Sequence, residues 1–112
     1  MLRIYAVMLE MCRAAAKVAA QIELHDKGLA QELRDAAQSV ALNTAEGMGS
    51  IGGHKRQRYQ TALGSAREAK ACPDVAMSMG YIQEIDATFA ETIDHSIATL
   101  VRLVHGRPRR GR

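Results

Sequence analysis

The chain has 112 residues, of which 47% are hydrophobic and 24% charged, and its formal net charge is +3 at pH 7. This length fits one domain with a single core, and three Tyr, one Phe and no Trp favour close-packed helices over a sheet. Cys12 and Cys72 have neither C-x-x-C nor zinc-site spacing and cannot build a disulfide framework, which indicates a reducing cytoplasm.

The first predicted helix covers residues 2–24, a stretch without proline or glycine. Glu10, Arg13 and Lys17 interrupt its apolar residues, so we expect this helix to be neither a signal peptide nor a membrane span. Its apolar surface is wider than one buried face requires, so we expect this helix to meet a second subunit. The predicted interface residues are Tyr5, Met8, Met11 and Val18.

A short turn at 25–28 predicts that the second helix, over 29–46, runs antiparallel to the first. Along one edge of its apolar face, polar side chains recur at the helical spacings i, i+4 and i+7. Gly47 and Gly49 are expected to end this helix, because glycine readily adopts the left-handed conformation of helix caps. The polar residues at these spacings are Ser39, Asn43 and Glu46.

The third predicted helix covers residues 54–79. Gly64 lies in its middle and is expected to let the second helix approach closely. Pro73 predicts a kink, or a break near residues 71–72, because proline removes a backbone hydrogen bond and clashes with the preceding turn. The polar edge of the second helix would then face Ser65 and Glu68 of the third, with Arg58 or Arg67 placed to neutralise the glutamates.

The fourth predicted helix covers residues 82–105 and follows a turn at Gly80 and Tyr81. The predicted domain is therefore an all-α, antiparallel up-and-down four-helix bundle over 1–105. Residues 106–112, with Pro108 and four arginines, are predicted to be a basic disordered tail.

Two interpretations compete for the polar seam, which consists of Ser39, Asn43, Glu46, Ser65 and Glu68. The favoured one is structural, since short polar side chains near a core can satisfy one another and fix helix register. The other is a ligand or metal site, but a di-iron bundle needs two Glu-x-x-His motifs, which this sequence lacks. Glu91 and His95 fall on the solvent-facing side of the fourth predicted helix, so we interpret them as a surface pair. The sequence thus predicts no enzyme, no metal and no cofactor.

Positive charge is concentrated in two clusters, which leave an acidic remainder of eight basic and 12 acidic residues. Such clusters suit a polyanion, although a solvated loop and tail would have the same composition. The glycine-rich loop before Lys55 is not a P-loop, because no Ser or Thr follows the lysine. The predicted nucleic-acid-binding residues are Lys55, Arg56, Arg58, Arg107, Arg109, Arg110 and Arg112.

A longer pattern joins the seam to the later turns: Ser39-x-x-x-Asn43-x-Ala45-Glu46-Gly47-x-Gly49, then Gly64-Ser65-x-x-Glu68, then Gly80-Tyr81. It resembles the signature of bacterial four-helix-bundle proteins encoded by 23S rRNA intervening sequences, and the match spans nearly the whole chain. The resemblance implies assembly as a homopentameric barrel. The chain is also similar to the accessory variability protein of diversity-generating retroelements, a basic pentamer that engages a reverse transcriptase and nucleic acid. Pro73 and Thr44 depart from the family pattern.

Together these features predict a non-catalytic oligomeric scaffold that binds RNA or DNA weakly and independently of sequence. The alternatives are an accessory protein of a retroelement reverse transcriptase and a purely protein-binding structural module. An enzyme is disfavoured because neither cysteine has a histidine beside it in the sequence.

Overall fold

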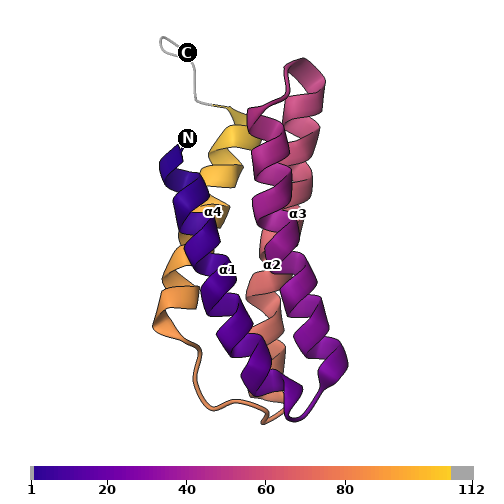
Figure 1. The fold of residues 1–112 in the computed structure, drawn as a ribbon, viewed down its shortest axis with the longest axis vertical. Helices are drawn as coiled ribbons and strands as arrows, with labels where there is room; N and C mark the ends of the chain where they lie inside the picture. Colours follow the sequence, from indigo (N-terminus) through magenta and orange to yellow (C-terminus); the bar gives the residue numbers. More distant parts are fainter. Residues whose placement is uncertain (1, 107–112) are drawn as a thin grey trace.

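A computed structural model describes residues 2–106, which form four α-helices and no strand. Short links join α1 to α2 and α2 to α3, and a longer connection leads to α4 (Figure 1). The predicted all-α four-helix bundle is confirmed. The helices are α1 (Leu2–Glu23), α2 (Lys27–Met48), α3 (Gly52–Ser78) and α4 (Ala87–His105).

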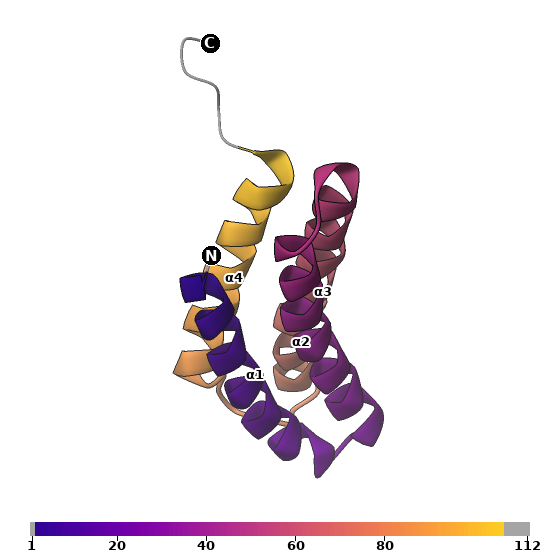
Figure 2. The same ribbon diagram turned by 45° about the horizontal axis from the view of Figure 1, so that its top comes forward.

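Each helix packs mainly against two neighbours: α1 and α3 both contact α2 and α4. Figure 2 shows α1 beside α4 and α2 beside α3. The core between them is rich in buried alanines, whose small side chains allow close packing of the helices. Among the described residues, none of the helices combines the length and apolar character needed to cross a membrane.

The interface prediction for α1 has to be corrected at three positions. Met8, Met11 and Val18 are buried in the core of the single chain, so they offer no surface to another subunit. The wide apolar surface of α1 has a simpler cause, since this helix packs against both α2 and α4. Tyr5 is half-buried, and Leu9 is 38% exposed.

Side-chain caps set two helix starts that differ from the predicted ones. The Asp26 carboxylate accepts a hydrogen bond from the Leu29 amide at 2.9 Å, and α2 therefore begins at Lys27. The Asp86 carboxylate likewise accepts one from the Phe89 amide at 2.9 Å, so α4 begins five residues later than predicted. Residues 82–86 belong to the connection before α4.

The structure also differs from the predictions at the glycines and the proline of α2 and α3. Gly47 is a buried residue inside α2, and the cap, Gly49, has φ −92°, outside the left-handed region. Gly64 is exposed, and no atom of another helix lies near the position of its missing side chain. It therefore permits no close approach between helices. Pro73 is buried, and α3 continues through it without the break predicted near residues 71–72.

Candidate functional site

The polar seam joins α2 to α3 through three short side chains. The hydroxyls of Ser39 and Ser65 lie 2.7 Å apart and share a hydrogen bond across the two helices. The Asn43 amide donates to both the hydroxyl and the carbonyl oxygen of Ser39, each at 3.0 Å. The side chains of these three residues hydrogen-bond to one another, and such a contact between two helices fixes their register.

The two glutamates of the seam do not meet. Arg58 Nε lies 3.1 Å from a carboxylate oxygen of Glu46, and the two side chains form an exposed ion pair between α3 and α2. Glu68 is exposed and, within residues 2–106, forms neither a hydrogen bond nor an ion pair with the seam. The predicted seam is thus corrected at Glu68. An exposed pair such as Arg58–Glu46 adds at most about 1 kcal/mol to stability.

Thr44 lies in α2, one position after Asn43, and its buried hydroxyl has no hydrogen-bond partner among the described residues. A buried hydroxyl without a partner costs about 1–3 kcal/mol. We expect Thr44→Val, which keeps the shape and removes the hydroxyl, to raise the free energy of unfolding by about 1 kcal/mol. Urea denaturation measures the change.

Thr92 supplies the matched control for this prediction. It is also buried, but its hydroxyl donates to the Thr88 carbonyl oxygen at 2.7 Å. Thr92→Val should therefore bring no comparable gain. Equal stabilisation by the two substitutions would show that the orphaned hydroxyl of Thr44 is not the cause.

Gly47 and Tyr59 form a close contact between α2 and α3 that the sequence did not reveal. A β-carbon on Gly47 would lie 2.5 and 2.7 Å from two carbons of the Tyr59 ring. Tyr59 is only 3% exposed, and burial raises the pKa of its hydroxyl, which remains protonated at neutral pH. The absence of a side chain at Gly47 therefore makes room for this ring.

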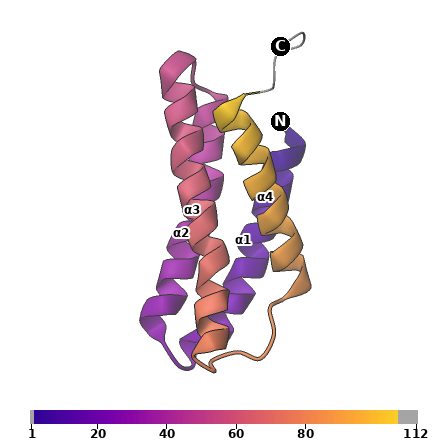
Figure 3. The same ribbon diagram turned by 180° about the vertical axis from the view of Figure 1, so that it is seen from behind.

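The start of α3 and the end of α4 meet at one end of the bundle (Figure 3). Lys55 and Arg56 are exposed in the first turns of α3, which has neither a capping side chain nor an acidic residue there. Beside them is a hollow of about 230 Å³, here called the basic hollow. Its lining residues are Gly52, Lys55, Arg56, Tyr59, Leu103, Val104, His105 and Gly106.

The basic hollow brings together part of the predicted nucleic-acid-binding set. Lys55 and Arg56 line it, whereas Arg58 pairs with Glu46 on the α2 side. His105 was missed, because its proximity to Lys55 depends on how the two helix ends pack. The remaining predicted residues lie outside the described part of the chain: Arg107, Arg109, Arg110 and Arg112.

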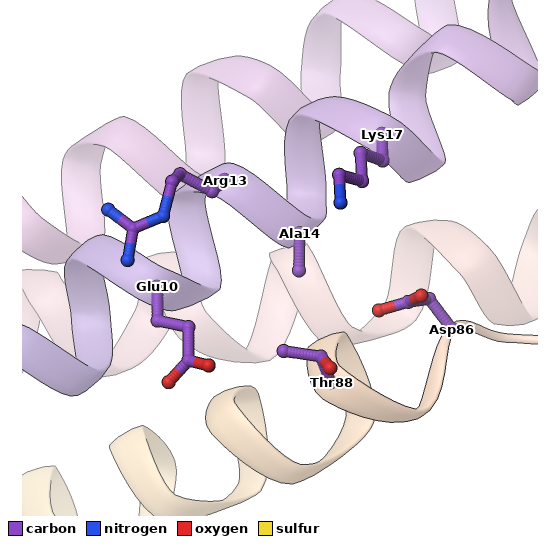
Figure 4. A pocket seen from close by; sticks show the side chains of 6 residues that line it. All are labelled: Glu10, Arg13, Ala14, Lys17, Asp86 and Thr88. Carbon is purple, nitrogen blue, oxygen red and sulfur yellow. The ribbon is translucent and has the colours of Figure 1, made fainter.

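A second hollow, of about 270 Å³, lies between α1 and the start of α4 (Figure 4). Arg13 and Lys17 approach it from α1 together with Glu10, and Asp86 lies on the opposite side. Charges of both signs surround this hollow, so its electrostatics favour a polyanion less than those of the basic hollow.

The two cysteines have environments that suppress thiol reactivity. Burial, aided by the negative charges of Glu32 and Glu68, raises the pKa of Cys72 to about 11. Burial also raises the pKa of Cys12, whose thiol donates to the Ala37 carbonyl oxygen at 3.4 Å. Both thiols are therefore protonated at neutral pH and poor nucleophiles. Within residues 2–106, no group of three or more His, Cys, Asp or Glu side chains is arranged to hold a metal ion.

Comparison with protein families gave a match over most of the chain. The family described as 23S rRNA-intervening sequence protein matches residues 1–104, which include almost the whole bundle. Comparisons with curated proteins and with solved structures found no match. Because this match covers most of the chain, the chain belongs to the 23S rRNA-intervening sequence protein family.

Proposed function

We propose that this protein is a non-catalytic oligomeric scaffold that binds RNA or DNA through the basic end of its bundle without reading the base sequence. The observation that carries the proposal is the position of Lys55 and Arg56, exposed beside the basic hollow together with His105. A concave surface with two exposed cations attracts the phosphates that all nucleic acids share.

Helix stability does not account for the two cations. Positive side chains at a helix N-terminus oppose the helix dipole and weaken the helix locally. The same dipole, with the free amides of the first turn, favours a bound anion. Lys55, Arg56 and the start of α3 would therefore act together on a phosphate group.

The remaining polar groups support a binding role over a catalytic one. The seam residues Ser39, Asn43 and Ser65 are engaged with one another, and burial keeps the thiols of Cys12 and Cys72 protonated. A nucleophile needs a neighbouring base or a lowered pKa, and these groups have neither.

Assembly would strengthen a weak site. We propose that antiparallel up-and-down bundles associate as a homopentameric barrel, as the family resemblance implies. Five copies of the basic end on one particle would turn weak individual contacts into avid binding. The arginines beyond Gly106 would add positive charge to each copy.

Replacing Lys55 and Arg56 together with Gln tests the proposed site. The double variant should bind RNA and DNA more weakly and show a shallower dependence of binding on salt, by about one in log–log slope for each phosphate that it no longer neutralises. Fluorescence anisotropy over a salt series measures both effects. Replacing Arg13 and Lys17 with Gln is the matched control, because it removes the same charge from α1 and should change binding less.

Two results would contradict the proposal. Equal reductions of affinity in the two double variants would mean that overall charge, not the basic end, governs binding. A wild-type protein that binds neither RNA nor DNA at low salt would favour the alternative, a dedicated protein partner such as a reverse transcriptase.

A further inference from the structure

Another recess adjoins the basic hollow, but neither Arg56 nor His105 lines it. It measures about 350 Å³ and is lined by Met48, Lys55, Tyr59 and Leu103, so it is here called the apolar hollow. Lys55, Tyr59 and Leu103 line both hollows. The two recesses are therefore contiguous, with Arg56 lining only the basic hollow and Met48 only the apolar hollow.

We propose that the apolar hollow receives an unpaired nucleobase, and that the basic end therefore prefers single-stranded nucleic acid to a duplex. This inference rests on the proposed function and names the form of nucleic acid that it selects. Lys55 and Arg56 would hold the backbone phosphate, while the base of the same or the next nucleotide lies against Met48 and Leu103.

The chemistry of the two hollows matches that of a nucleotide. A nucleotide has a charged phosphate at one end and a flat base with apolar faces at the other, and the hollows present complementary surfaces side by side. Burial of a base face against apolar side chains depends little on base identity, because the contact is non-directional and every base has such a face. The site would therefore discriminate strandedness without discriminating sequence.

Other occupants fit less well. In a duplex the bases are paired and stacked, so a base can enter a recess only if it first leaves the stack, which opposes binding. The residues after Gly106 are close enough along the chain to reach the site, but their four arginines have the same sign as its cations. Charge complementarity thus favours an external polyanion with an accessible base.

The test compares three probes of matched length, about 12 nucleotides, at low salt. One is a mixed-sequence single strand, one is the same backbone with abasic sites, and one is the corresponding duplex. The intact single strand should bind roughly tenfold more tightly than the abasic strand, because the abasic strand keeps its phosphates but has no base to place in the apolar hollow. The duplex should also bind more weakly than the intact strand.

Met48→Ala should reduce the preference for the intact strand towards one while leaving the affinity for the abasic strand unchanged, because Met48 lines the apolar hollow and not the basic hollow. Leu103→Ala is a second variant that should also reduce this preference, in case the first unfolds, and helical circular dichroism checks the fold of each. Leu9→Ala on α1 is the matched control, because it removes an exposed apolar side chain that lines neither hollow.

The outcomes separate the two proposals. Equal binding of all three probes would overturn the base site but leave phosphate binding at the basic end intact. A strand preference that survives both Leu103→Ala and Met48→Ala would also overturn it, by placing the base contact elsewhere. Absence of binding to every probe at low salt would overturn the proposed function and this inference with it.

Discussion

Gly47→Ala should lower the free energy of unfolding by about 2 kcal/mol, although alanine is the better helix former. The new β-carbon would lie 2.5 Å from a Tyr59 ring carbon, well inside van der Waals contact. A ring that is only 3% exposed has little room to move, so α2 and α3 would have to separate. Thermal unfolding monitored by circular dichroism should show a Tm lower by about 10 °C.

Gly64→Ala is the matched control, because it makes the same chemical change inside the neighbouring helix. Gly64 is exposed, and apart from its chain neighbours and the backbone of its own helix no atom lies within 4 Å of the added β-carbon. The substitution should stabilise the protein by about 0.5–1 kcal/mol through helix propensity. Opposite signs for the two substitutions would support the contact argument. Stabilisation by both would mean that the Tyr59 ring yields easily.

Gly47 and Gly64 illustrate which features of the helix packing the sequence predicts and which it does not. Periodicity and turn residues predicted four helices, because the pattern of apolar residues reports which side of each helix is buried. They did not reveal which glycine faces a neighbouring helix. That depends on the rotation of α2 and α3 about their axes, so close approach was expected at Gly64 and occurs at Gly47.

The start of α4 was misplaced for a related reason. Ile82 and Ile85 continue the apolar pattern of α4 and are buried or half-buried, but they lie in the connection before the helix. Burial of an apolar residue does not require a helical backbone. The decisive local signal was Asp86, whose carboxylate caps the first turn.

The sequence likewise predicted only part of the candidate site. Ser39, Asn43 and Ser65 were predicted to meet because helical spacing places them at the edges of facing helices, and they do. Helical spacing alone did not show that Glu68 is exposed, or that His105 lines the same hollow as Lys55. Both facts depend on the three-dimensional packing of helices and not on distance along the chain.

Met11→Asp should abolish the folded state. Met11 has no exposed surface, and the carboxylate would enter an apolar core without a partner, at a cost of several kcal/mol. The free energy of unfolding of an average domain is only about 5–15 kcal/mol, so this cost is a large part of it. Loss of the helical circular dichroism signal at room temperature is the expected result. A variant that stays folded would contradict the placement of Met11 in the core.

Leu9→Asp introduces the same charge two positions earlier on α1, and it separates folding from assembly. Leu9 is 38% exposed in the single chain, so its carboxylate would remain hydrated and the helical signal should persist. If the exposed side of α1 contacts another subunit, the new charge would be desolvated there, and the oligomer should dissociate. Sedimentation velocity at micromolar concentration measures this. A folded variant that assembles like the wild type would exclude Leu9 from the interface, and a monomeric wild type would contradict the proposed barrel itself.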